Sequence, residues 1–163
     1  MENKLRKKLL GQMIEKRKES LKSLHAKPTS LFIRHLDCGS CNACETELNA
    51  LANPIYDSAQ WGIHFEASPR HADVLALTGP YVRSLDRAAR STVEAMPVPR
   101  IITIGDCAKN AGKFQNSYAI IPYPEEWNKP DEVNNPIIID HVPGCPPSPE
   151  EILRSLFVVV YEL

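Results

Sequence analysis

The sequence predicts an α/β sandwich in which helices cover both faces of a parallel sheet. Short apolar runs recur along the chain, and each is followed by a turn and then by a helical pattern. Two of these runs, residues 74–77 and 137–139, are almost continuously apolar. Strands of this kind are buried on both faces, as in parallel sheets covered by helices. The chain of 163 residues matches the usual size of one domain.

The elements are expected in a regular order. Leucines spaced between charges predict a helix over residues 5–24, and Pro28 marks the linker that follows it. Strands are predicted at residues 30–35, 63–67, 73–78, 100–104 and 137–142. Helices are predicted from near Asn42, over residues 84–95, and from Pro149 to the end of the chain. The last helix has a clear start signal, with Ser148 as the N-cap, Pro149 at the first helical position and Glu151 placed to complete a capping box.

Charge divides the chain into two parts. Residues 1–27 contain nine Lys or Arg and three Asp or Glu, although the net charge of the whole chain is −1. A basic helical arm, residues 1–27, is therefore predicted to precede a single α/β domain, residues 28–163. Such an arm favours contact with an acidic surface, either another subunit or anionic lipid headgroups, and not sequence-specific binding of nucleic acid. A solvated helix that improves solubility is the alternative.

Two hydrophobic targeting signals are missing from the sequence. Residues 1–22 are broken by charges and lack the apolar stretch of a secretion signal. The longest apolar candidate, residues 156–161, is far shorter than the roughly 20 residues that span a bilayer. We therefore expect a cytoplasmic chain that associates with a membrane only through partners. Its five cysteines would stay reduced there, available as metal ligands or nucleophiles.

The cysteines follow the carboxyl ends of predicted strands. Cys38, Cys41 and Cys44 follow the first strand, Cys107 the fourth and Cys145 the fifth. In open α/β sheets the ligand crevice lies outside these ends, so cysteines distant in sequence should meet at one edge.

Neighbouring residues are suited to a bulky guest at this edge. Gly105 and Gly144 would let the backbone approach closely. If Asn42 caps the following helix, Cys44 lies in its first turn, where the helix dipole favours the thiolate that metal ligation requires.

Three kinds of occupant are compatible with this cysteine set. Structural zinc usually takes two closely spaced ligand pairs, whereas here Cys41 and Cys44 form one pair and Cys107 and Cys145 stand alone. This spacing favours an iron–sulfur cluster in a preformed crevice over zinc. A catalytic thiol would need a neighbouring base, and no histidine has a diagnostic spacing. Zinc and reactive or inert thiols are the alternatives.

Four segments resemble one known family. They are DCGSCNACE at residues 37–45, SPRHADV at 68–74, GDCA at 105–108 and VPGCPP at 142–147. In this order they are similar to the small subunit of membrane-bound, energy-converting [NiFe] hydrogenases, a family that includes the 20-kDa subunit of respiratory complex I. The resemblance spans about residues 30–163. The two-residue spacing of Cys41 and Cys44 resembles the hydrogenase branch, because the complex I branch places its first two ligands side by side.

The resemblance implies a flavodoxin-like fold and one [4Fe–4S] cluster, the proximal cluster, held by Cys41, Cys44, Cys107 and Cys145. It implies an electron-transfer subunit of an oxidoreductase complex, with no catalytic residue of its own. The implied partners are a [NiFe] hydrogenase-type large subunit, a ferredoxin-like iron–sulfur subunit and membrane subunits, with this chain in a peripheral arm on the cytoplasmic face. The alternatives are the equivalent subunit of a complex I-like quinone- or sulfur-reducing complex, and a zinc-stabilised assembly module.

The motifs contain four more candidate residues. Glu45 and Glu47 follow the cysteine pair, where they would move protons at the subunit boundary or simply cap the helix N-terminus. Arg70 and His71 resemble a family pair near the partner interface, where they would tune the cluster or contact the large subunit. An ordinary loop histidine is the alternative for His71.

Two features depart from the family pattern. Cys38 precedes Cys41 by the same spacing that separates Cys41 from Cys44, so a ligand pair shifted to Cys38 and Cys41 is an alternative. The position of Glu47, three residues after Cys44, favours the unshifted pair. After Cys107, relatives have paired glycines before an aromatic residue, whereas this chain has alanine and glycine at residues 111–112. The family pattern therefore does not predict the shape of that loop in this chain.

Overall fold

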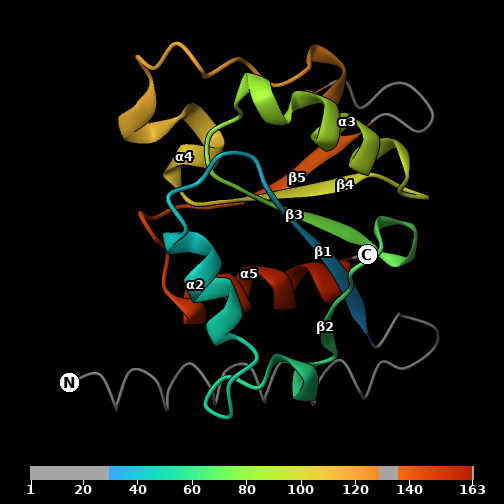
Figure 1. Ribbon diagram of the computed structural model, residues 1–163. Helices are drawn as coiled ribbons and strands as arrows, with labels where there is room; N and C mark the ends of the chain where they lie inside the picture. The colour runs from blue at the N-terminus through green and yellow to red at the C-terminus, as the bar shows by residue number, and fades with distance from the viewer. Residues whose placement is uncertain (1–29, 129–135, 163) are drawn as a thin grey trace.

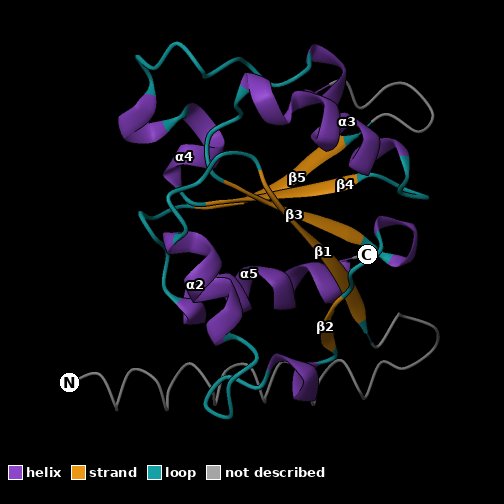
Figure 2. Cartoon of the chain, viewed as in Figure 1, coloured by secondary structure: helices purple, strands orange, loops and turns teal. Residues whose placement is uncertain are grey.

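The chain forms one five-stranded sheet in which all strands are parallel (Figures 1 and 2). The computed structural model describes residues 30–128 and 136–162, so the predicted helix over residues 5–24 lies outside the described residues. The strands are β1 (Leu31–Asp37), β2 (Ile63–Phe65), β3 (Val74–Thr78), β4 (Arg100–Ile104) and β5 (Ile137–Val142). Their order, β2-β1-β3-β4-β5, is that of flavodoxin-like folds. The predicted fold class is confirmed.

Helices cover both faces of the sheet (Figure 1). On one face lie α2 (Ala43–Ala50) and α5 (Pro149–Glu162), and on the other lie α3 (Asp86–Glu94) and α4 (Asp106–Asn110). The side chains of β3 divide between the two faces. Val74 and Ala76 pack in the core with α2 and α5, whereas Leu75 and Leu77 pack in the core with α3. Every residue of β3 is buried, as expected of a central strand covered on both sides.

Short 3₁₀ helices complete the described elements. They are η1 (Ser58–Trp61), η2 (Pro69–His71), η3 (Arg83–Leu85), η4 (Gly112–Phe114) and η5 (Glu125–Asn128). Most of them lie in the connections that lead out of a strand or into one, and η3 runs directly into α3.

Four strands end at the same level. Across the sheet, Asp37 of β1 pairs with Thr78 of β3, Thr78 with Ile104 of β4, and Ile104 with Val142 of β5. Strand β2 is shorter and pairs only with the first three residues of β1. The loops that carry the cysteines therefore start side by side along one edge of the sheet.

The first turn of α5 contains the predicted capping box. The backbone N–H of Ser148 donates to Oε2 of Glu151 at 2.8 Å, and the N–H of Glu151 donates to Oγ of Ser148 at 3.4 Å. The Ser148 hydroxyl also donates to Oε2 of Glu151, at 2.9 Å. These donors hold the pKa of Glu151 below its ordinary value.

We expect Ser148→Ala to lower the free energy of unfolding by about 1 kcal/mol, measured by urea denaturation of the full chain at pH 7. Because the pKa of Glu151 is lower in the folded chain than in the unfolded chain, its contribution is complete above the unfolded pKa and is lost as the pH falls through the folded one. The difference between variant and wild type should therefore shrink below about pH 4. Ser84→Ala, at an exposed serine of η3, is the control, and an equal loss there would contradict the capping role.

Candidate metal centre

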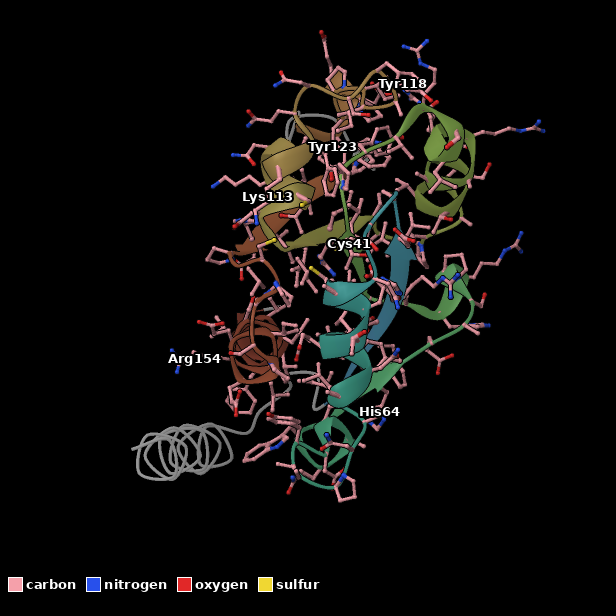
Figure 3. The ribbon with its side chains drawn as sticks, turned by 60° about the vertical axis from the view of Figure 1, so that its left-hand side comes forward. Cys41, His64, Lys113, Tyr118, Tyr123 and Arg154 are labelled. Carbon is pink, nitrogen blue, oxygen red and sulfur yellow. The ribbon has the colours of Figure 1, made fainter. Side chains whose placement is uncertain are left out.

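The loop between β1 and α2 is shaped by Asp37. Its carboxylate accepts hydrogen bonds from the backbone N–H groups of Gly39, at 2.8 Å, and of Ser40, at 2.7 Å. Gly39 has φ +121°, and a Cβ there would lie 2.6 Å from a methyl group of Val82. This tight turn leaves Cys41 exposed at the start of α2, where Figure 3 shows it.

Helix α2 begins directly after Asn42, close to the predicted position, but Asn42 does not cap the helix through its side chain. Asn42 occupies the N-cap position with φ 68°, a left-handed conformation that asparagine tolerates. Its side chain makes no capping hydrogen bond. Cys44 nevertheless lies in the first turn, half-buried against the core beneath α2 and α5.

A reciprocal pair of hydrogen bonds joins the loops after β4 and β5. The N–H of Asp106 donates to the carbonyl oxygen of Gly144 at 2.8 Å, and the N–H of Gly144 donates to Oδ1 of Asp106, also at 2.8 Å. Each of these residues is next to a cysteine, Cys107 in one loop and Cys145 in the other. The pair therefore holds these two cysteines beside each other, although 38 residues separate them in sequence.

Gly105 connects this pair of loops with α2. It ends β4 with φ +87°, and its N–H donates to the carbonyl oxygen of Val142 at 2.8 Å. A Cβ at this position would lie only 2.6 Å from Sγ of Cys44. The absence of a side chain therefore lets the Cys44 sulfur reach the end of β4, next to Cys107.

The thiols at this edge influence one another's ionisation. The pKa of Cys44 is raised to about 12, first because the thiol is buried and then because negative charge on Glu45, Cys107, Cys41 or Cys145 would repel its thiolate. The pKa of Cys107 is also raised, by burial and then by Cys145 and Cys41. Burial and mutual repulsion therefore outweigh the stabilisation of the Cys44 thiolate that the first turn of the helix was expected to provide. A positively charged metal group would remove this penalty.

The number of thiols at this edge suits a four-iron cluster. Among the described residues, no three His, Cys, Asp or Glu side chains are arranged to hold a single metal ion. Cys41, Cys107 and Cys145 nevertheless lie close enough to Cys44 to raise its pKa. A four-iron cluster takes one thiolate on each of its four irons, so four neighbouring thiols match the ligand set that it requires.

Cys38 lies apart from the other cysteines. It is fully buried in the core on the α3 face, together with Tyr81 and Trp127, whereas Cys44 packs against the core on the opposite face. Burial, and then the neighbouring Asp37, raises the pKa of Cys38 to about 12. The geometry therefore gives no support to a ligand pair shifted to Cys38 and Cys41.

A comparison with protein families shows to which family the chain belongs. Residues 41–159 match the family described as NADH ubiquinone oxidoreductase, 20 kDa subunit. The chain belongs to this 20 kDa subunit family. The resemblance found in the four sequence segments is confirmed.

Two curated relatives illustrate the family. The chain is 35% identical over 126 residues to formate hydrogenlyase subunit 7 of Escherichia coli, which covers 76% of this chain and 46% of that protein. It is 36% identical over 135 residues to the probable membrane-bound hydrogenase subunit mbhJ of Pyrococcus furiosus, covering 82% of this chain and 76% of that one. The chain thus spans about half the length of the first relative and three quarters of the second.

Chains in two solved structures share the fold of this member of the 20 kDa subunit family. A chain of the membrane-bound sulfane sulfur reductase, an archaeal respiratory membrane complex, has a TM-score of 0.64 and 24% identity, covering 83% of this chain and 72% of that one. A chain of the NAD⁺-reducing [NiFe]-hydrogenase has a TM-score of 0.52 and 18% identity, covering 80% of this chain and 92% of that one. In the described part of the 20 kDa-family chain, no helix combines the length and the apolar character needed to cross a bilayer.

Glu45 is buried beside a histidine that the sequence analysis missed. The side chain of Glu45 points into the structure from α2, and its Oε1 lies 3.6 Å from Nε2 of His35, too far for a hydrogen bond. Neither carboxylate oxygen has a hydrogen-bond partner among the described residues, so Glu45 does not cap the helix. His35 instead shares a hydrogen bond of 2.9 Å with Oγ1 of Thr78. Burial lowers the pKa of His35, and the charge of Glu45 opposes this shift.

The other predicted residues lie at different distances from the cysteines. Glu47 is half-buried in α2, in the turn after Cys44. Arg70 and His71 are exposed in η2, which leads into the start of β3 beside the first half of β1. The cysteines follow the other end of these strands, so the structure does not bring Arg70 and His71 to the candidate centre.

The loop after Cys107 keeps a glycine-like shape without paired glycines. Ala111 has φ 63° and Gly112 has φ 49°, so both residues are left-handed. A Cβ at Gly112 would lie 3.0 Å from Sγ of Cys107. The backbone N–H of Lys113 donates a hydrogen bond to the Cys107 thiol. The chain therefore turns tightly around Cys107, and Ala111 is the strained residue of that turn.

We expect Ala111→Gly to raise the free energy of unfolding by about 1 kcal/mol, because an L-alanine in the left-handed region costs about 1–2 kcal/mol and glycine gives back part of this through its freedom in the unfolded chain. Urea denaturation of the full chain measures the change. The matched control is Ala88→Gly, at an exposed and right-handed position of α3, which should lower stability by about 1 kcal/mol. Destabilisation by both changes would contradict the strain at Ala111.

Proposed function

We propose that this chain is the electron-transfer subunit of a membrane-bound [NiFe] hydrogenase-type complex. In this proposal it carries one [4Fe–4S] cluster, the proximal cluster, on Cys41, Cys44, Cys107 and Cys145. The observation that carries the proposal is the meeting of these four thiols, from three loops distant in sequence, at one edge of the sheet. Membership of the 20 kDa subunit family supports it, as do relatives named as subunits of a formate hydrogenlyase and of a probable membrane-bound hydrogenase.

The protein would bind and surround the cluster, and a bound cluster of this kind takes up and gives up single electrons. Gly105 leaves room for the sulfur of Cys44, and the hydrogen bonds between Asp106 and Gly144 fix the loops of the other two ligands. The N–H of Lys113 would stabilise negative charge on the Cys107 sulfur, which makes an added electron more favourable.

The substrate chemistry would belong to other subunits. We propose that a [NiFe] hydrogenase-type large subunit reacts with hydrogen and that a ferredoxin-like iron–sulfur subunit exchanges electrons with this chain. Membrane subunits of the same complex would hold this peripheral arm at the cytoplasmic face. The chain would thus be part of an oxidoreductase while containing no catalytic residue itself.

Glu45 supports a contact with the large subunit. A buried carboxylate without hydrogen-bond partners is costly, and both oxygens of Glu45 are in this position among the described residues. We propose that a donor from the large subunit completes this site in the complex. Proton transfer by Glu45 and Glu47, and partner contact by Arg70 and His71, stay predictions of the sequence analysis.

The alternative within the same class is a complex I-like complex that reduces quinone or sulfur. The description of the matching family, NADH ubiquinone oxidoreductase, favours it. The spacing of Cys41 and Cys44 and the names of the two relatives favour the hydrogenase reading. Against the zinc-stabilised assembly module stands the ligand spacing, because Cys107 and Cys145 are single and far apart in sequence whereas structural zinc usually takes two closely spaced pairs.

Hydrogen-dependent reduction of the native complex tests the proposal. The complex is purified without oxygen, exposed to hydrogen gas and examined by electron paramagnetic resonance. We expect a signal from a reduced [4Fe–4S] cluster that disappears when this subunit carries Cys145→Ser. A cluster reduced by a quinol or by sulfide but not by hydrogen would favour the alternative complex, and zinc without any cluster signal would contradict electron transfer.

A further inference from the structure

A cavity opens beside Cys107 and Cys145, next to α4 and the end of β5. Its volume is about 340 Å³, room for roughly ten waters. Its lining comes from α4, from the segment after it and from the end of β5, and consists of Asp106, Cys107, Lys109, Asn110, Gly112, Lys113, Gln115, His141 and Cys145. Cys41 and Cys44 do not line it, so the cavity lies behind two of the four candidate ligands.

The cavity gathers positive charge. Residues 30–128 and 136–162 contain two lysines, Lys109 and Lys113, and both line this cavity while remaining exposed to solvent. Neither forms an ion pair with an acidic side chain of the described residues. The lysines are therefore available to an anion from outside the chain.

The neighbouring acidic groups are already engaged. Oδ1 of Asp106 accepts the N–H of Gly144, and Asp140 accepts the N–H of His141 through Oδ1 and the hydroxyl of Ser155 through Oδ2. They offset part of the lysine charge without pairing with either lysine.

His141 forms the wall between β5 and the cavity. Its Nδ1 shares a hydrogen bond of 3.0 Å with Oγ1 of Thr103. Burial, and then the nearby Lys109 ammonium, lowers the pKa of His141, while Asp106 and Asp140 act in the opposite direction. The imidazole is thus held on the sheet side of the cavity, and the lysines form its open side.

Exposed aromatic side chains stand on the same segment. Phe114 is 42% exposed and Tyr118 is 95% exposed, values that leave most of the tyrosine ring in water. Figure 3 shows Lys113 and Tyr118 on the upper part of the molecule, with Cys41 below them. Aromatic residues are enriched at protein interfaces, so exposed aromatic side chains on the segment that carries Lys113 indicate a macromolecular partner and not a free small anion.

We propose that the cavity between α4 and β5 receives acidic side chains of a partner protein, which Lys109 and Lys113 bind by charge, and that the same partner contacts the exposed Phe114 and Tyr118 on the following segment. The docking itself needs only these residues. That the partner exchanges electrons with this chain rests on the proposed function, because the cavity lies directly behind two of the ligands assigned there.

Zero-length cross-linking of the native complex tests the docking. A carbodiimide activates a carboxyl group, the lysine amine displaces it as a urea, and an amide bond forms only where the two groups were in contact. Mass spectrometry should find Lys109 or Lys113 joined to an Asp or Glu of another subunit. Lysines that stay unmodified, or that join only to this chain, would overturn the proposal.

Charge-removing variants provide a second readout. The double variant K109Q/K113Q is compared with R83Q/R87Q, which removes two exposed positive charges from η3 and α3. We expect the first variant to be retained about tenfold less well by the immobilised complex at low salt, with the difference shrinking as salt rises. Equal retention of the two variants would contradict the proposal.

Iron analysis and inorganic phosphate separate the remaining outcomes. A chain without iron that still cross-links through these lysines keeps the docking and contradicts the electron-transfer role. A chain with iron but without the cross-link keeps the electron-transfer role and contradicts the docking. If millimolar phosphate binds the isolated full chain at this cavity and abolishes the cross-link, the cavity is a small-anion site and the protein partner is overturned.

Discussion

Gly105→Ala should remove the cluster from an otherwise folded chain. The new Cβ would lie 2.6 Å from Sγ of Cys44, far inside the contact distance of carbon and sulfur. Alanine would also be strained, because φ +87° with ψ 152° is a conformation that glycine alone normally adopts, and the cost is about 1–3 kcal/mol. Relief requires either that Cys44 rotates away or that the end of β4 moves, and both displace a candidate ligand. We expect the iron content to fall from about four per chain to near zero.

A glycine with positive φ that lies away from the cysteines is the control for this variant. Gly62 has φ 77° in the turn before β2, which is distant from the cysteine edge. Because Gly62 is left-handed, with ψ 20°, Gly62→Ala should lose about 1–2 kcal/mol of stability in urea denaturation but keep its iron. Circular dichroism confirms that both variants are folded. Full iron in folded Gly105→Ala would contradict the assignment of Cys44 as a ligand.

Cys107 and Cys38 should respond in opposite ways to replacement. Cys107→Ala removes a candidate ligand at the edge of the sheet, so the cluster should be lost, with near-zero iron and sulfide. Cys38→Ala changes only the core on the α3 face and should keep its iron, at a stability cost of about 1 kcal/mol. Iron and sulfide analysis and urea denaturation of both variants measure the contrast.

The same analysis of Cys41→Ala decides between the two possible cysteine pairs. We expect this variant to lose its iron, as Cys107→Ala does. Loss of the cluster from Cys38→Ala together with retention in Cys41→Ala would move the ligand set to Cys38 and would contradict the position of Cys38 as a core residue.

Apolar runs predicted the strands well where they were uninterrupted. The bounds of β4 and β5 agree with the prediction because arginine and proline limit the apolar runs clearly. Strand β1 continues two residues beyond the predicted end, since Asp37 still pairs with Thr78 although its side chain is polar and exposed. The helix α4 was not predicted, because five residues form little more than one turn and show no periodicity.

The meeting of the cysteines followed from topology, but their surroundings did not. Strand-end loops of a parallel sheet converge, so the edge where Cys107 and Cys145 lie could be predicted. The hydrogen bonds between Asp106 and Gly144, and the approach of His35 to Glu45, depend on how loops and side chains face each other across strands. A histidine within the apolar run of β1 was the one signal in the sequence for the second of these contacts.

Iron and acid-labile sulfide in the full chain, purified without oxygen, test the central claim most directly. The account predicts about four of each per chain, in a form that becomes paramagnetic on reduction. A folded chain that contains neither, or that contains one tightly bound zinc ion in their place, would contradict it.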